Sequence, residues 1–257
     1  MKNFKKILSL ILALALVFTT FVACGKKGED EENKDDSEAK KAVEEVAEKY
    51  LDCIKKMNFD KAAELCTEEY AKEAPQGDIR DMFNVKEFKT VLGDSAKYID
   101  DDEAEKMLER IIEAIEDKAK NAEVEIKEVE VDEDTATVTY ELKAFDIESI
   151  DMNEIIEDVK SNYTDKLDSN YIIEEFLKER NVDMTVEEFK ELSKTNQEAL
   201  TDFTGWFEDY MSDVVPELFD DLTSEMKAAI GKCKNKVENK TMELELVDDE
   251  WKVSDNK

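Results

Sequence analysis

EVEIKEVEVDEDTATVTYELKAF, residues 123–145, carries the clearest periodic pattern in this chain. From Ala136 to Ala144, apolar residues alternate with polar ones, which is the period of a strand with one buried face. The first half holds two alternating apolar pairs whose phases differ by one residue: Val124 with Ile126, and Val129 with Val131. A bulge near Lys127-Glu128 would bring both pairs to the same face. With Asp132-Glu133-Asp134 as its turn, the stretch predicts a β-hairpin.

A second pattern of the same period lies at the C-terminus. Its apolar residues alternate with polar ones on both sides of a turn predicted at Asp248-Asp249: Met242, Leu244, Leu246, Trp251 and Val253. A lone hairpin is at best marginal in water. We therefore expect the two hairpins, about 90 residues apart, to pair edge to edge in one antiparallel sheet that largely buries Trp251. A helical stripe is expected to cover the apolar face of this sheet: Val46, Tyr50 and Ile54.

The other periodic segments have apolar residues at helical spacing. Residues 42–57 and 58–70 predict an antiparallel helical hairpin with Asn58 at its corner, and further helices are expected at 79–92 and from about Asp102. Residues 147–237 return to helical spacing, with a capping box of Thr185 and Glu188 and with Pro216 at a kink or a helix start. The predicted fold class is α+β and mostly helical, a single domain over 42–257 with a helical insertion at about 147–237.

The N-terminus has the layout of a secretory signal. Lysines precede an uncharged apolar run from Ile7 to Val22, which is short for a membrane span. The run ends in Phe21-Val22-Ala23-Cys24, which resembles the lipobox of bacterial lipoproteins. That resemblance implies a signal peptide at 1–23 and a diacylglyceryl group on Cys24, whose two acyl chains, of the palmitate kind, would anchor the protein stably. The alternatives are a cleaved signal without lipid and an uncleaved membrane anchor.

Residues 24–41 are too polar to form a core and are expected to be a disordered tether. The expected location is the extracytoplasmic face of the cell membrane.

Composition excludes several functional classes. The formal net charge of −32 provides no basic patch, so nucleic acid is not an expected partner. The chain contains no His, which removes imidazole catalysis and His-metal sites. Acidic turns such as Asp100-Asp101-Asp102 lack the spacing of a calcium loop, so we expect no metal and no cofactor. Besides Cys24, three cysteines lie on apolar stripes and are expected to be buried thiols, with a Cys53–Cys66 disulfide as the alternative: Cys53, Cys66 and Cys233.

Two motifs carry a resemblance to a family. Asn58-Phe59-Asp60-Lys61-Ala62 stands at the helical corner, and the chain ends in an apolar strand, an acidic turn and Trp251-Lys252-Val253. This order resembles a group of uncharacterised lipoproteins of Gram-positive bacteria with a nuclear-transport-factor-two-like body. The resemblance covers about 41–146 and 237–257 and implies a curved sheet wrapped around a helical hairpin as a cone. Enzymes of that superfold use a carboxylate, Tyr or His in the cone, which would make Tyr140 the candidate here.

No catalytic residue can be assigned from the residues themselves. The expected function is a non-enzymatic, membrane-anchored lipoprotein that binds an envelope protein or a small ligand through its cone or its insertion. The alternatives are a small-molecule hydrolase or isomerase in the cone and a structural envelope spacer. Three aromatic residues are the candidates for ligand binding: Tyr140, Trp206 and Tyr210. Tyr140 is also expected as a core residue, and the aromatic run 203–219 as either helix core or the lining of a groove.

Overall fold

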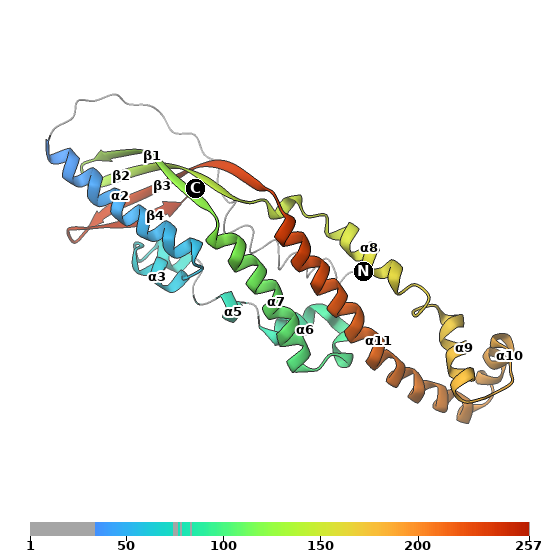
Figure 1. The fold of residues 1–257 in the computed structure, drawn as a ribbon. Coiled ribbons are helices and arrows are strands. Elements are labelled where there is room, and N and C mark those ends of the chain that lie inside the picture. Colours follow the sequence, from blue (N-terminus) through green and yellow to red (C-terminus); the bar gives the residue numbers. More distant parts are fainter. Residues whose placement is uncertain (1–33, 74–76, 78, 83, 257) are drawn as a thin grey trace. The chain divides into compact units, whose positions relative to one another are not determined.

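The computed structural model describes residues 34–73, 77, 79–82 and 84–256 (Figure 1). The predicted signal peptide, Cys24 and the tether as far as residue 33 lie outside the described residues. Among the residues that are described, no helix is both long and apolar enough to cross a membrane.

The described residues divide into two compact units. The sheet unit consists of the described residues up to Asn84 together with 112–150 and 229–256, and the helical unit consists of 85–111 and 151–228. Most of the predicted insertion therefore packs with a segment that precedes the first hairpin. The prediction that 42–257 behaves as one domain stays a prediction.

Both predicted hairpins belong to one antiparallel sheet of the sheet unit, in the order β1-β2-β3-β4. The strands are β1 (Glu123–Asp132), β2 (Thr135–Phe145), β3 (Asn235–Val247) and β4 (Glu250–Asn256). β2 pairs with β3 from Thr135 opposite Glu245 to Phe145 opposite Asn235. The predicted bulge is confirmed, because the register of β1 shifts between Ile126 and Glu128.

The turns of the two hairpins use acidic residues with left-handed backbone. Glu133 has φ 52°, and Asp248 and Asp249 have φ 52° and 65°. A two-residue turn with positive φ at both positions matches the twist of the flanking strands, and Asp tolerates it better than most residues do. A second bulge, between Glu243 and Leu244, was not predicted.

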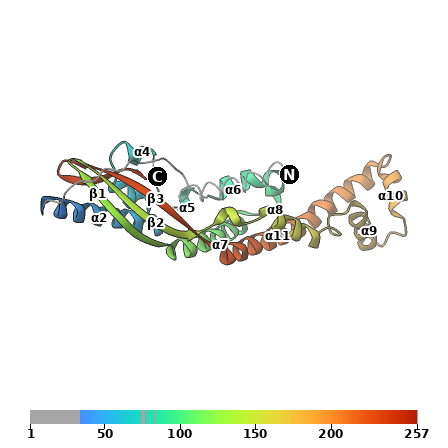
Figure 2. The ribbon, with the colours of Figure 1, turned by 90° about the horizontal axis from the view of Figure 1, so that it is seen from above.

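One face of the sheet is buried against α2 (Lys34–Lys55), which runs along it in Figures 1 and 2. Val138, Met242 and Val253 of the sheet are fully buried, and Trp251 is 9% exposed. The predicted stripe of Val46, Tyr50 and Ile54 packs into this core, where Val43 and Ala47 extend it: both are fully buried. The predicted sheet, its helical cover and the burial of Trp251 are confirmed.

The helical corner differs from the prediction in two ways. α2 begins at Lys34, eight residues before the expected start at Ala42, so the last part of the predicted tether is helical. Its Lys, Glu and Ala content favours helix even without a buried face. Asn58 caps the next helix as predicted, accepting a hydrogen bond from the Lys61 N–H (3.3 Å).

The second helix of the corner, α3 (Phe59–Glu64), is shorter than predicted because the chain then pairs with β4. The Thr67 N–H donates to the Val253 carbonyl and the Val253 N–H donates to the Leu65 carbonyl, both at 2.9 Å. Cys66 faces Val253 in this parallel bridge. Two short helices follow, α4 (Tyr70–Glu73) and α5 (Ile79–Met82).

The cysteines of the described chain are free thiols: Cys66 and Cys233 are buried as predicted, and Cys53 is half-buried. No disulfide joins Cys53 to Cys66.

The helical unit contains α6 (Val85–Leu92), η1 (Gly93–Tyr98), the first half of α7 (Asp101–Lys120), α8 (Met152–Asn162), α9 (Ser169–Glu179), α10 (Val186–Ser193) and most of α11 (Gln197–Lys232). The capping box before α10 is confirmed, with Glu188 N–H donating to Thr185 Oγ1 (3.2 Å) and Thr185 N–H donating to the Glu188 carboxylate (2.8 Å). Pro216 lies inside α11, so no helix starts there, and the kink stays a prediction. Figure 2 shows α9 and α10 beside the first turns of α11.

Candidate functional site

The structure places Tyr140, the candidate of the cone, in the core of the sheet unit. The residue is 2% exposed, and its hydroxyl donates to Asn256 Oδ1 at 2.8 Å. Burial raises the pKa of Tyr140, so its hydroxyl stays protonated at neutral pH. Tyr50 of α2 is equally buried, and its hydroxyl lies 3.4 Å from that of Tyr70. These tyrosines pack in the core between helix and sheet, and the hydroxyls of Tyr50 and Tyr140 each have a hydrogen-bond partner.

The thiol nearest to these tyrosines is also held inert. Cys66 Sγ donates to the Ala62 carbonyl at 3.2 Å. Burial raises the pKa of the Cys66 thiol to about 12, so the thiolate needed for nucleophilic attack is scarce at neutral pH. The space between α2 and the sheet, where the resemblance predicts a cone, is filled by packed side chains.

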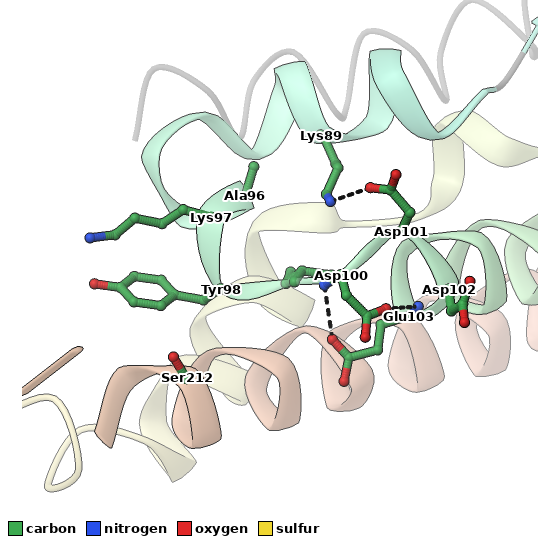
Figure 3. A pocket seen from close by; sticks show the side chains of 10 residues that line it. Lys89, Ala96, Lys97, Tyr98, Asp100, Asp101, Asp102, Glu103 and Ser212 are labelled. Atoms are coloured by element: carbon green, nitrogen blue, oxygen red, sulfur yellow. Dashed lines mark hydrogen bonds and ion pairs between the residues drawn. The ribbon is translucent and has the colours of Figure 1, made fainter. Parts of the chain in front are cut away.

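An open hollow of about 710 Å³ lies in the helical unit between η1, the start of α7 and Ser212 of α11 (Figure 3). The acidic side chains that line it are those of the turn Asp100–Asp102 and of Glu103. Asp100 and Glu103 cap the start of α7: the Glu103 N–H donates to Asp100 Oδ1 (2.7 Å) and the Asp100 N–H donates to Glu103 Oε2 (3.1 Å). Lys89 reaches from α6 to the carboxylate of Asp101 in Figure 3.

The outer side of this hollow is formed by Lys97 and Tyr98, which project together from η1 (Figure 3). Lys97 Nζ lies 4.5 Å from the centre of the Tyr98 ring and 3.4 Å from Glu208 Oε1. Both lysines that line the hollow are therefore paired with carboxylates. Within the described ranges, no group of three His, Cys, Asp or Glu side chains is arranged to hold a metal ion.

Trp206 and Tyr210, the other two candidates, belong to an aromatic cluster at the beginning of α11. We define the aromatic cluster by its six rings: Phe176 of α9, Phe189 of α10, and Phe203, Trp206, Phe207 and Tyr210 of α11. The Phe176 ring lies 5.2 to 5.5 Å from three others, and the Trp206 and Tyr210 rings stack at 5.1 Å. The prediction that another element covers this run is confirmed, because α9 and α10 pack on it.

Polar atoms of the cluster are individually satisfied. Trp206 is 7% exposed and its Nε1 donates to Glu179 Oε2 at 2.6 Å. The hydroxyl of Tyr210, which is half-buried, donates to the Lys166 carbonyl at 3.0 Å. Burial raises the pKa of Tyr210, and the nearby Tyr171, Glu175 and Glu217 raise it further.

Two large side chains of neighbouring segments are exposed. Tyr171 is 36% exposed on α9, and Leu167, in the connection before α9, is 39% exposed. We call Leu167, Tyr171 and Tyr210 the rim of the aromatic cluster. The sequence analysis did not single out Leu167 or Tyr171. A signal for Tyr171 exists: it precedes the buried pair Ile172-Ile173 and so lies outside the apolar stripe of its helix, where an aromatic residue is exposed.

Comparisons with protein-family models, with curated proteins and with solved structures found no match. The resemblance to lipoproteins with a nuclear-transport-factor-two-like body thus stays a prediction.

Proposed function

We propose that this chain is a lipoprotein anchored through Cys24 to the extracytoplasmic face of the cell membrane, and that it binds a partner protein through the aromatic cluster. The observation that carries the binding role is the rim. Leu167 follows Lys166, whose carbonyl binds the Tyr210 hydroxyl, and Tyr171 lies on α9; both side chains are exposed and offer apolar and aromatic area. Rigid aromatic side chains at a surface are the residues that dominate protein interfaces.

The insertion supports this role better than the cone does. In the sheet unit Tyr50 and Tyr140 are 3% and 2% exposed and their hydroxyls have partners. A ligand there would have to displace packed side chains, whereas the rim is accessible as it stands.

The anchor supports an envelope location. Lys34, where α2 starts, lies ten positions after Cys24 in the chain. A chain extends by at most about 3.6 Å per residue, so the lipid would hold that helix start within about 36 Å of the membrane. The net charge of −32 makes adsorption of the body on an anionic bilayer unfavourable. The protein would stand on the membrane through its lipid while its surface stays free for a partner.

The anchoring half is tested with Cys24→Ala in cells that produce the protein. Acyl labelling should vanish and unprocessed precursor should accumulate. Labelling that persists in this variant would overturn the assignment of Cys24.

The binding half is tested by placing a photoreactive phenylalanine analogue at Tyr171 or, as a matched control, at the half-buried Tyr98 of the same unit. Irradiation of intact cells should give a discrete cross-linked adduct from position 171 and none from position 98. Equal yields from both positions, or no adduct from position 171, would contradict the proposal.

A further inference from the structure

The two edges of the sheet differ in how the described part of the chain covers them. Along β4, the segment Leu65–Thr67 exchanges two backbone hydrogen bonds with Val253, both at 2.9 Å. β1 pairs with β2 on one side, and within the described ranges no backbone hydrogen bond joins residues 123–132 to any other segment. This edge strand of ten residues, which contains no Pro and no Gly, therefore presents a row of N–H and C=O groups that a further strand could pair with.

The bulge of β1 divides the strand into two halves whose carboxylates differ in their partners. In the half before the bulge, lysines already hold the acids: Glu123 pairs with Lys143 (2.8 Å) and Glu125 pairs with Lys127 (2.7 Å). Charge on this half is therefore largely neutralised within the sheet itself.

The half after the bulge carries three exposed acids that make no ion pair in the described part of the chain: Glu128, Glu130 and Asp132. Their partners across the strand pair are uncharged: Thr139, Thr137 and Thr135. Residues directly opposite each other in antiparallel strands point to the same face of the sheet. The three acids therefore form a line of negative charge along the outer face at the open edge, and we call them the acidic row.

The other face of the same half is apolar and incompletely covered. Val129 and Val131 of β1 lie opposite Val138 and Ala136 of β2 in the core that α2 covers. The β2 residues are 0% and 5% exposed, whereas Val129 and Val131 are only half-buried. A further strand beside β1 would extend this face and remove more of their apolar surface from water.

We propose that an extended segment of another protein adds to the sheet as a strand beside β1, with lysine or arginine side chains along the acidic row and apolar side chains next to Val129 and Val131. Main-chain hydrogen bonds would hold such a strand, and its alternating side chains would set its sequence preference. A second copy of β1 does not fit, because its own acids would lie beside the acidic row, and like charges opposite each other destabilise a strand pair. This surface belongs to the sheet unit and goes beyond the proposed function, whose rim lies in the helical unit.

The charge pattern is tested with the full chain in detergent and a fluorescein-labelled peptide of four Lys-Val repeats, with binding followed by fluorescence anisotropy. The double variant Glu128→Gln/Glu130→Gln should weaken binding about 3- to 10-fold, because it removes two cross-strand charge pairs. The matched control Glu68→Gln/Glu69→Gln removes the same charge from two exposed acids that follow the segment on β4, and should bind as the parent does. Equal affinities of the two double variants, or no binding of the peptide to the parent, would overturn the inference.

Strand pairing is tested through the backbone of the peptide. Alternate amides of a strand point to the same neighbour. N-methylation of all valines therefore blocks either every N–H that faces β1 or none of them, and N-methylation of all lysines does the reverse. One of the two methylated peptides should bind as the unmodified peptide does, and the other should bind about 10-fold more weakly or less. Equal affinities of the two methylated peptides would show that no strand is added.

Hydrogen exchange then locates the edge that the peptide occupies. Binding of the Lys-Val peptide should slow the exchange of amides in residues 123–132 and leave residues 250–256 unchanged, because the edge at β4 already has a partner segment. Slower exchange at β4 without a change at β1 would contradict the assignment of the open edge.

Discussion

Trp251→Ala is the substitution that tests the architecture of the sheet unit most directly. Trp251 lies opposite Leu246 in the β3–β4 pair and is 9% exposed in the core shared with α2. Truncation of a large buried aromatic costs about 3–5 kcal/mol, and the cost is highest where the surroundings cannot collapse. Here β4 is held by β3 on one side and by the hydrogen bonds between Val253 and the Leu65–Thr67 segment on the other. We therefore expect a loss near the upper end of that range.

The loss should be visible as a shift of the urea midpoint. With a slope of about 2 kcal/mol per M, a destabilisation of about 4 kcal/mol lowers the midpoint by about 2 M. Because helices dominate the circular dichroism of a mostly helical protein, the assay is hydrogen exchange of peptides from β2 and β3, measured by mass spectrometry over a urea series. Trp251→Phe, which keeps a ring, should lose less than half as much.

Trp206→Ala is the matched control, because Trp206 is the buried tryptophan of the helical unit and is 7% exposed. It should increase exchange in α9 and α11 peptides without the same effect on β2 and β3. A Trp251→Ala urea midpoint within about 0.5 M of the parent would contradict the burial of Trp251 in this core, since truncating a large buried aromatic residue should lower the free energy of unfolding by several kcal/mol.

Three further predictions concern other parts of the chain. Thr185→Ala should destabilise the α10 region by about 1 kcal/mol at neutral pH, because it removes the acceptor of the Glu188 N–H. The Thr185 N–H and hydroxyl also donate to the Glu188 carboxylate and lower its pKa, so this half of the cap is present above the usual carboxyl range and is lost as pH falls through the lowered value. The difference in exchange of α10 peptides between parent and variant should therefore shrink in acid without vanishing. Cys66 should resist iodoacetamide at pH 8 in the folded protein, since burial raises its pKa to about 12, and the half-buried Cys53 should be modified before it. Intact-mass spectra of Cys53→Ser and Cys66→Ser, recorded over time, would show which of the two thiols reacts first. Replacing 151–228 by a short Gly/Ser linker should leave protected β2 and β3 amides, because the Asp146 N–H donates to the Lys234 carbonyl (2.8 Å) and keeps the two ends together; loss of that protection would contradict an independent sheet unit.

The sheet could be predicted because its signal is local and its geometry has few alternatives. A period of two places alternate residues on one face, and the phase change after Ile126 allows only a bulge if both halves are to stay buried. Pairing of the two hairpins then follows from the requirement that each apolar face be covered and each hairpin gain neighbours. The structure has the bulge and the pairing where this reasoning put them.

The departures occur where a distant partner overrides a local pattern. The apolar residues from Phe59 to Tyr70 have helical spacing, yet the helix stops at Glu64, because the next residues gain backbone hydrogen bonds to β4. Those bonds come from a strand almost two hundred positions later, and no periodicity near Cys66 indicates them. The bulge between Glu243 and Leu244 could not be predicted either, since apolar and polar residues alternate through this part of β3 without a change of phase.

The candidate site shows a similar division between what composition predicts and what packing adds. Spacing alone predicted that the aromatic run of α11 would be covered, but it could not say which ring remains at the surface. Packing decides this: with α9 and α10 on the run, Trp206 is 7% exposed, while Phe203, Phe207 and Tyr210 stay partly buried. Glu175 of α9 and Glu217 of α11 both raise the pKa of the Tyr210 hydroxyl, an influence from two helices that spacing along either helix alone does not indicate.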